Sequence, residues 1–464
     1  MPTQLTLHLP TSAPGSLTSP FRDSAFEQNK LDAIHRWVPW IAGFSAGFVA
    51  DVFQQYAPVN EGRAISVLDP FAGVGTTLVE GLRHGFHVAG FEINPFAVLA
   101  ARVKCTAFTI EPQILAEAIQ WFTAQARERT NSIDRAFLKG DDISQCEPAP
   151  ISHPPVHFRS RVPFFSPAVE RKVLHCLDII REISSTPIQE IVLLALGSIL
   201  VQISNYSYEP SLGSRKAAGK EEILNADVVG ILTTKLQSMF EDIVHYRTEM
   251  ERFAYVPSAM IIHDSSLCLK SYLAPDSIDI VVTSPPYLNN YHYVRNTRPH
   301  LFWLDFIATP AQLRSLENAN FGKYWQTVRD AEPIKLDFCL PELEEIIHEI
   351  ANQNQDKGVY GGQGWANYAA SYFNDSYRLC SHLQYVLKPS GVAVIVLGNS
   401  IIQGVSVPTD RLFGAIGELC GLKLEGIYLL RDKRVGTSII NSVIRNGKAT
   451  KVSLYETAVV LRKQ

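Results

Sequence analysis

The first segment with residue types suited to chemistry is a strand end that carries a serine, two prolines and a tyrosine. The β-branched run Ile280–Thr283 leads into Ser284-Pro285-Pro286-Tyr287. Neither proline can donate a backbone N–H, so the strand ends there in a rigid tip. A flat base stacked on Tyr287 could donate its exocyclic amine hydrogens to the Ser284 hydroxyl and the Pro285 carbonyl. These acceptors would align the nitrogen lone pair for attack on a methyl sulfonium. Taken alone, the tetrapeptide is equally typical of a rigid surface turn.

The second segment is a glycine turn between a short apolar strand and a helix. It reads Asp69-Pro70-Phe71-Ala72-Gly73-Val74-Gly75-Thr76-Thr77, and the next strand ends in Glu92. Glycines let a backbone approach a ligand closely, and an acid about 20 residues further on can accept hydrogen bonds from both ribose hydroxyls. The third glycine of a dinucleotide fingerprint and the Lys-Ser/Thr of a P-loop are both missing. Because Asp69 would repel a pyrophosphate, the turn favours a cationic ligand such as a sulfonium amino acid.

Two further polar positions follow predicted strands. Asp264, with Ser265, comes at the end of the strand over 259–264 and can accept a hydrogen bond from an adenine amino group. An Asp-Ser pair at this position is equally typical of a helix N-cap. Asn94 precedes Pro95, which indicates the first turn of a helix.

Together these segments resemble the amino-group DNA methyltransferases of the Thr-Ser-Pro-Pro-Tyr type. That family uses S-adenosylmethionine to methylate adenine N6 or cytosine N4 of a base flipped out of the duplex. The resemblance covers residues 65–105, 259–305 and 365–461, and residues 30–53 resemble the helix near the methionine end of the cofactor. A tip that begins with Ser, in place of Asp or Asn, is most similar to the cytosine-N4 branch, with adenine N6 as the alternative.

The resemblance assigns a role to each matching residue. It implies that Asp69 faces the amino group of the cofactor, that Glu92 holds the ribose and that Asp264 holds the adenine. It places the target base on Ser284, Pro285, Pro286 and Tyr287. The residues that it places at the cofactor are Asp69, Phe71, Gly73, Gly75, Thr76, Glu92, Asn94, Asp264 and Ser265.

Basic and aromatic residues beside the tip and in the first insertion are candidates for contacts with double-stranded DNA, the expected partner. Side chains of these types neutralise phosphates or read guanine edges. The net charge of −4 gives no global basic field, so a nucleic acid would need local patches of this kind. Each patch alone is equally typical of solvated loop charge. The candidates are Tyr291, Arg295, Arg298, Arg215 and Lys216.

The order of elements predicts an α/β fold: a Rossmann-like methyltransferase mixed sheet with helices on both faces, plus a mostly helical insertion. In chain order, we expect a flexible arm over residues 1–25 and the cofactor-binding half over 26–109. A helical insertion over 110–257 is expected to hold all or part of the target recognition region. The catalytic half follows over 258–464 and includes an irregular stretch at about 290–364.

Several classes of protein are disfavoured. The seven cysteines form no CxxC pair and no Cys/His cluster, so no structural metal is expected. None of them follows a proline or lies near Tyr287, which argues against a cytosine-C5 mechanism. The first 20 residues lack the pattern of a signal peptide, and no apolar run is long enough to span a bilayer. We therefore expect a prokaryotic cytoplasmic protein without a membrane partner.

The leading hypothesis is one half of a restriction–modification system, with a cognate restriction endonuclease that acts separately; oligomeric state is left open. An RNA base methyltransferase or a protein-glutamine methyltransferase is a second enzymatic hypothesis. The glutamine enzymes favour Asn at the start of the tip, and no RNA-binding module is recognisable. A nucleic-acid-binding protein with a degenerate cofactor pocket is the non-enzymatic hypothesis. Against it, Asp69, Glu92, Asp264 and Ser284 are all present.

Overall fold

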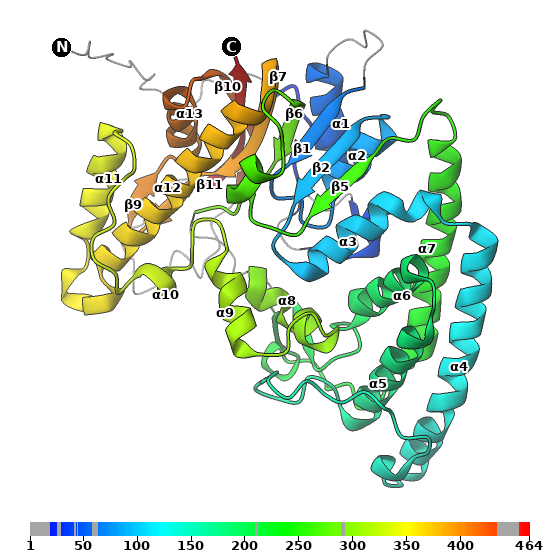
Figure 1. Cartoon of the computed structure of the whole chain (residues 1–464). Helices are drawn as coiled ribbons and strands as arrows, with labels where there is room; N and C mark the ends of the chain where they lie inside the picture. Colours follow the sequence, from blue (N-terminus) through cyan, green and yellow to red (C-terminus); the bar gives the residue numbers. More distant parts are fainter. Residues whose placement is uncertain are drawn as a thin grey trace, which may run out of the picture.

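A seven-stranded mixed sheet forms the centre of the protein in a computed structural model (Figure 1). The structure describes residues 19–25, 29–40, 43, 45–57, 64–208, 212–288, 293–433 and 454–464. The strand order is β10-β11-β7-β6-β1-β2-β5. The five strands from β7 to β5 are parallel, and β11 runs antiparallel to both of its neighbours. The strands are β1 (Ser66–Asp69), β2 (His87–Phe91), β5 (Ala259–Ile262), β6 (Ile278–Thr283), β7 (Leu387–Gly398), β10 (Leu422–Lys433) and β11 (Leu454–Lys463).

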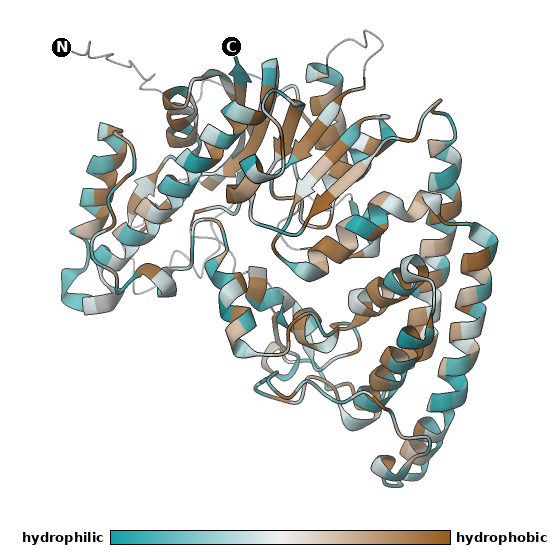
Figure 2. Ribbon diagram, in the orientation of Figure 1, coloured by the Kyte–Doolittle hydropathy of each residue, from teal (hydrophilic) through white to brown (hydrophobic). Residues whose placement is uncertain are grey.

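The central strands are buried on both faces. All six residues of β6 are buried, and β1 and β2 are almost as buried, which is the pattern of a parallel sheet covered by helices (Figure 2). Successive side chains alternate between two hydrophobic clusters. Ile280 and Val282 belong to one cluster, while Val281 belongs to the other. This alternation fixes the register of β6, because a shift by one residue would exchange the two faces.

Helices cover both faces of the sheet. One cluster packs under α1 (Ala46–Tyr56), α2 (Thr76–Arg83) and α3 (Pro95–Thr106), and the other under α12 (Gly362–Val386) and α13 (Thr409–Leu419). The predicted α/β class, a Rossmann-like methyltransferase sheet with helices on both faces, is therefore confirmed. None of the helices among the described residues combines the length and the apolar character needed to cross a membrane.

The insertion between β2 and β5 is mostly helical, as its apolar periodicity predicts. Its helices pack together beside α3 and extend away from the sheet (Figure 1). The stretch 204–220, whose sequence shows little periodicity, contains a small hairpin of strands β3 and β4 that the sequence did not reveal. The elements are α4 (Pro112–Lys139), α5 (Pro167–Glu182), α6 (Thr186–Ile199), β3 (Tyr206–Tyr208), β4 (Leu212–Ser214) and α7 (Val228–Met250), with 3-10 turns η3 (Ala107–Thr109), η4 (Ile143–Gln145) and η5 (Lys216–Ala218).

The stretch 290–364 corrects the sequence prediction of an irregular segment, because it contains four short helices. The prolines of this stretch are compatible with its helices: Pro310 and Pro341 lie in first turns, where a missing N–H is harmless, and Pro299 lies inside α8. A capping box between Thr309 and Gln312 starts α9. The elements are α8 (Tyr293–Trp303), α9 (Pro310–Asn318), α10 (Trp325–Val328) and α11 (Pro341–Ala351). The remaining described elements lie elsewhere in the chain, apart from η7. They are the 3-10 segments η2 (His35–Trp37), η6 (Ser266–Ser271) and η7 (Gln355–Tyr360) and a hairpin of β8 (Ser400–Ile402) and β9 (Val405–Val407).

Candidate functional site

The site lies where the strand order reverses between β1 and β6, which is the position at which open α/β sheets bind their ligands. Both strands end there, and side-chain hydrogen bonds join them. Thr283 Oγ1 donates to Asp69 Oδ1 at 2.6 Å, and Thr77 Oγ1 donates to the carbonyl of Val282 at 3.2 Å. The glycine turn after β1 and the tip after β6 are thus held in one rigid unit.

The Asp69 carboxylate is directed into this junction. It is 1% exposed and also accepts a hydrogen bond from the backbone N–H of Phe71 at 3.0 Å. Burial raises its pKa to about 6 against the opposing effect of these hydrogen bonds. The resemblance implies that Asp69 faces the amino group of a cofactor, but its carboxylate does not line the cavity described below. In the structure, its contacts are those of a residue that shapes the turn.

Two glycines of the turn adopt left-handed backbone angles. Gly73 has φ +50° and Gly75 has φ +85°. A Cβ on Gly75 would lie 3.1 Å from Ala101 Cα, and one on Gly73 would lie 3.2 Å from Trp40 Nε1. The turn therefore requires glycine at both positions, for its conformation and for its close contacts with α3 and Trp40.

Glu92, at the end of β2, is fixed by two backbone donors. Its Oε2 accepts from the N–H of Gly73 at 2.9 Å, and its Oε1 accepts from the N–H of Asn94 at 2.8 Å. Burial raises the pKa of Glu92 to about 7, and these hydrogen bonds oppose the rise. Asn94 caps α3 through Phe96 N at 3.1 Å, and its amide donates to Thr297 Oγ1 at 2.7 Å. Each carboxylate oxygen keeps a further lone pair for a hydroxyl donor in the cavity.

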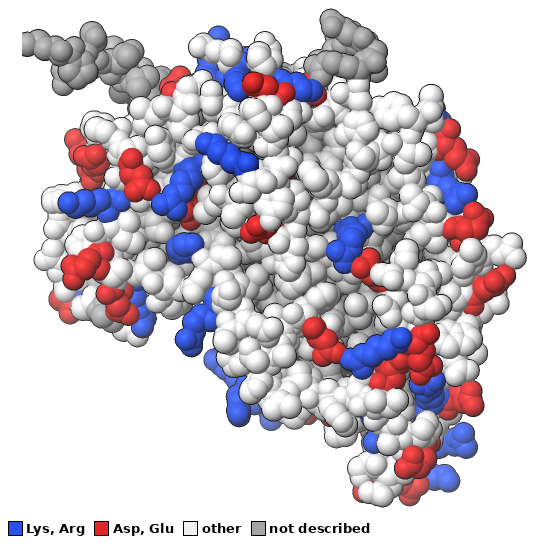
Figure 3. Space-filling model, in the orientation of Figure 1, with Lys and Arg blue, Asp and Glu red and all other residues white. Residues whose placement is uncertain are grey.

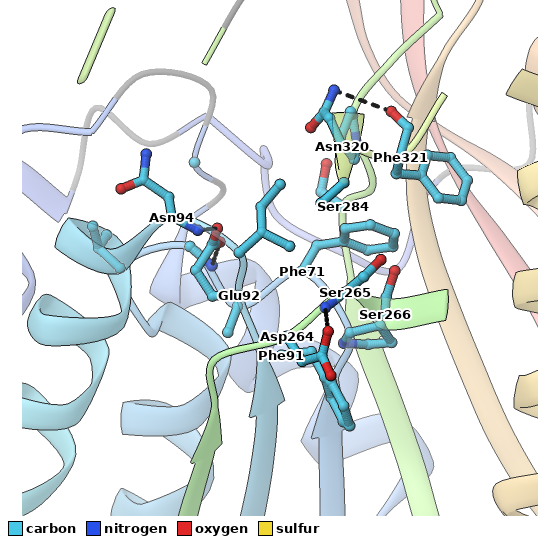
Figure 4. A pocket seen from close by; sticks show the side chains of 18 of the residues that line it. Phe71, Phe91, Glu92, Asn94, Asp264, Ser265, Ser266, Ser284, Asn320 and Phe321 are labelled. Carbon is cyan, nitrogen blue, oxygen red and sulfur yellow. Dashed lines mark hydrogen bonds between the residues drawn. The ribbon is translucent and has the colours of Figure 1, made fainter. Parts of the chain in front are cut away.

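Asp264 follows β5 at the opposite end of the cavity from the Asn94 side chain (Figure 4). Its Oδ2 accepts from Tyr272 Oη at 2.7 Å, and its Oδ1 accepts from the N–H of Ser265 at 2.7 Å. The hydrogen bond from Tyr272 is the main reason that the pKa of Asp264 lies below its usual value. The side chain of Ser265 accepts from Leu267 N at 3.3 Å, so the N-cap interpretation of this pair is correct for Ser265.

The tip after β6 presents an oxygen to the cavity. Ser284 Oγ donates to the carbonyl of Val396 on β7 at 3.3 Å. Because its single hydrogen is used in that bond, the Oγ is left as an acceptor toward the cavity. The Tyr287 ring lies over Gly398, where a Cβ would approach two of its carbons to 3.3 Å. Gly398 therefore makes room for the ring at the end of β7.

One cavity, about 900 Å³ including its open mouth, brings most of these groups together (Figure 4). Asp69, Gly75, Pro285 and Tyr287 do not line it; Gly75 lies in the turn beneath, and Pro285 is buried in the tip. The sequence-predicted residues that do line it are Phe71, Gly73, Thr76, Glu92, Asn94, Asp264, Ser265, Ser284 and Pro286.

The opposite side of the cavity consists of residues that the sequence analysis did not assign to the site. Phe321 packs edge-on against Phe71, with ring centroids 5.1 Å apart, and against Tyr372 at 5.4 Å. The cavity is also lined by Asn320, beside Phe321, by Val294 of α8 and by Trp40 from the segment before α1. No motif marks Asn320 or Phe321, whereas Trp40 lies in the 30–53 stretch that already resembles part of a cofactor site.

The predicted nucleic-acid contacts lie outside this cavity. Arg295 is exposed on α8, and the guanidinium of Arg298 lies over the rings of Phe158 and Phe302. Arg215 and Lys216 follow the β3–β4 hairpin, and Tyr291 lies outside the described residues. Within the described part of the chain, no group of three or more His, Cys, Asp or Glu side chains could hold a metal ion.

Known proteins resemble the chain along most of its length. It is 23% identical to Type II methyltransferase M.BsoBI of Geobacillus stearothermophilus, over 95% of this chain and 87% of that protein. It is 24% identical to Type II methyltransferase M.MvaI of Kocuria varians, over 75% of this chain and 73% of that protein. No protein-family model matches the chain.

The similarity to a solved structure is weak. The rRNA methyltransferase aviRa from Streptomyces viridochromogenes aligns over 96% of both chains with 10% identity and a TM-score of 0.33. At so low a score, the assignment of the fold rests on the strand order described above. The homologues of this chain are Type II methyltransferases, in agreement with the resemblance that its motifs predict.

Proposed function

We propose that the protein is a site-specific DNA methyltransferase that transfers a methyl group from S-adenosylmethionine to cytosine N4 of a flipped base. The observation that carries the proposal is the placement of Ser284. Its Oγ, which is left as an acceptor by the bond to Val396, lies on the same cavity as the carboxylates of Glu92 and Asp264. An acceptor for an amine hydrogen thus adjoins a pocket with acceptors for ribose and adenine.

The hydrogen-bond acceptors of the cavity fit this cofactor. Glu92 would accept hydrogen bonds from the ribose hydroxyls, and Asp264 would accept one from the adenine amine. Phe71, Gly73 and Thr76 would shape the wall around the cofactor, and Asn94 and Ser265 would border it. Bound S-adenosylmethionine would supply an electrophilic methyl group. Asp69 would act from behind the turn, by holding Phe71 and the end of β6 in place.

The reaction needs positioning more than a covalent nucleophile. As the cytosine N4 nitrogen forms its bond to the methyl carbon, the carbon–sulfur bond breaks and its electron pair stays on sulfur. Ser284 Oγ and the Pro285 carbonyl would accept hydrogen bonds from the amine and so direct its lone pair toward the methyl group. After the transfer, the surplus proton of the methylated amine would pass to solvent water. No cysteine lines the cavity among the described residues, in keeping with a mechanism without a covalent base adduct.

An amine in a base pair is engaged in the duplex, so the base must leave the stack to reach Ser284. Tyr287 offers a ring for a flipped base to stack on, and Gly398 lets that ring lie close to β7. The Type II class of the relatives supports a role in a restriction–modification system, with an endonuclease that acts separately.

Nucleoside analysis tests the proposal directly. Plasmid DNA from cells that express the protein is digested to nucleosides and weighed by mass spectrometry, with DNA from cells that express Ser284→Ala as the control. We expect N4-methylcytosine in the first sample only. N6-methyladenine in the first sample only would show that the protein methylates adenine N6 and not cytosine N4. Unmodified DNA together with methylated RNA or protein would contradict the proposal.

A further inference from the structure

Three segments that are far apart in the sequence form one surface beside the tip. They are the loop 156–162, the hairpin region 206–208 and 212–218, and helix α8. The N–H of Arg161 donates to Tyr206 Oη at 3.0 Å, which joins the loop to the hairpin. Tyr208 Oη donates to the carbonyl of Asn296 at 3.1 Å, and Leu212 N donates to Asn296 Oδ1 at 3.2 Å, which joins the hairpin to α8. We call this surface the hairpin face.

The hairpin face is basic although the whole chain carries a net charge of −4. No carboxylate among the described residues forms an ion pair with the basic side chains Arg159, Arg161, Lys216, Arg295 and Arg298. In Figure 3, blue side chains lie along the lower edge of the molecule, below the position of α9 in Figure 1. The red side chains in the lower part of the view lie mostly farther to the right. In the sequence, negative charge next to these segments comes from Glu209 between the two hairpin ranges, from Glu221 and Glu222 just beyond the hairpin, and from Asp305 after α8. Asp305 forms an ion pair with Arg181.

Arg298 is held by aromatic rings and not by a carboxylate. Its guanidinium lies over the rings of Phe158 and Phe302, at 5.5 and 5.7 Å from the two centroids. Its Nε is buried without a hydrogen-bond partner. Two aromatic rings therefore hold the guanidinium in place while no carboxylate neutralises it, and a planar set of N–H donors of this kind suits a phosphate.

The hairpin face adjoins the proposed catalytic tip. Helix α8 begins six residues after Tyr287, and its Val294 lines the same cavity as Ser284. Asn296, on the same turn of α8 as Arg295, accepts the two hydrogen bonds from the hairpin. A ligand that lies across the basic side chains therefore extends directly to the mouth of the cavity.

We propose that the hairpin face binds the phosphate backbone of duplex DNA and so positions the duplex over the tip. This inference rests on the proposed function, and it adds Arg159 and Arg161 to the residues that the sequence indicated. Lys and Arg side chains on irregular segments, without carboxylate partners, supply the sequence-independent part of DNA binding. The face would thus contribute to the affinity and to the register of the duplex.

The salt dependence of DNA binding tests this assignment. The variant combines Arg159→Gln, Arg161→Gln and Lys216→Gln, all at exposed positions. Binding of a random-sequence duplex is measured by fluorescence anisotropy over a range of salt concentrations. Each lost phosphate contact lowers the slope of log affinity against log salt by roughly 0.9, so the slope should fall by about 2 to 3. The affinity of the variant at low salt should fall as well.

The matched control is a triple variant on α4, Arg127→Gln, Arg135→Gln and Lys139→Gln, whose side chains are exposed and outside the hairpin face. It changes the net charge equally and should keep the wild-type slope. An unchanged slope in the hairpin-face variant, or an equal loss in the α4 variant, overturns the inference. Methylation of DNA by the wild type is measured alongside, so failure of the proposed function is recognised separately.

Discussion

The two sides of the cavity are held in place by different interactions. On the side formed by the sheet, hydrogen bonds fix each polar group: Glu92 by two backbone donors and Ser284 through Val396. The opposite side, with Phe321 from the stretch 290–364, depends on packing, as in the edge-on contacts of Phe321 with Phe71 and Tyr372. We call these the sheet side and the insertion side.

The two sides differ in role: the groups fixed by hydrogen bonds take part in binding and chemistry, whereas the packed rings give the cavity its shape. Polar groups that must meet a transition state or a ribose need a fixed direction, and backbone hydrogen bonds at strand ends supply it. A ring that only closes a cavity can be replaced by another apolar group of similar volume at a smaller cost. We therefore expect substitutions on the sheet side to affect catalysis and binding strongly, and substitutions on the insertion side to have small effects.

The largest effect is expected for Ser284→Ala. It removes the oxygen that accepts an amine hydrogen but leaves the carboxylates of the cavity unchanged. Methyl transfer should fall by about a hundredfold to a thousandfold, while calorimetry with S-adenosylmethionine should give a near-normal Kd. Tyr287→Ala should likewise remove methylation and keep cofactor binding, because the Tyr287 ring does not line the cavity.

The matched control for Ser284→Ala is Ser277→Ala, which lies just before the opposite end of β6 and donates to the carbonyl of Ala274. It should keep both activity and binding. Retained methylation in both Ser284→Ala and Tyr287→Ala would contradict the assignment of the tip. Loss of cofactor binding in Ser284→Ala would show that the substitution disturbs the sheet side as a whole.

A smaller effect, on binding, is expected for Glu92→Gln. The amide keeps one acceptor oxygen but turns a donor toward either Gly73 N or Asn94 N, so one backbone bond is lost with the charge. Hydrogen bonds to a charged group contribute about 1.5–3 kcal/mol, so Kd for S-adenosylmethionine should rise roughly tenfold to a hundredfold. Normal binding by a folded Glu92→Gln variant would remove Glu92 from the ribose site.

The pH dependence of cofactor binding is the next effect in size. The pKa of Glu92 is raised to about 7, and only its ionised form can accept hydrogen bonds at both oxygens. Affinity should therefore rise with pH up to about 7 and level off above it. Well below this pKa, it should fall by up to about tenfold for each pH unit. Calorimetry from acid to mildly alkaline pH measures the profile, and Glu92→Gln should flatten it.

Strand ends and glycine turns were predictable from the sequence because local chemistry determines them. The glycines at 73 and 75 require left-handed angles, and the two prolines after Ser284 end β6 whatever surrounds them. Short apolar runs indicated that β1 and β6 are buried strands. The parallel order of these strands then brought Glu92, Asp264 and Ser284 to one edge.

The insertion side was not predictable because distant packing determines it. Nothing in the sequence near Phe321 indicates that its ring meets Phe71, 250 positions earlier. The orientation of Asp69 was missed for a related reason: its partner Thr283 is 214 positions away in the chain, so the motif alone could not show the carboxylate turned inward. The helices of 290–364 were missed as well; each is 11 residues or shorter, so its apolar periodicity extends over few turns.

The smallest effect is expected for Phe321→Leu on the insertion side. The substitution removes two edge-on ring contacts, each worth about 0.5–1.5 kcal/mol beyond buried area, so the free energy of unfolding should fall by about 1–3 kcal/mol. Phe373→Leu is the control: Phe373 is buried, packs edge-on against the same Tyr372 and does not line the cavity. It removes one such contact, so in denaturant titrations it should lose about half as much stability from this source. Only Phe321→Leu should raise the Kd of the cofactor, and by no more than about threefold, or roughly 0.6 kcal/mol. A rise as large as that of Glu92→Gln would show that the insertion side holds the cofactor as firmly as the sheet side does.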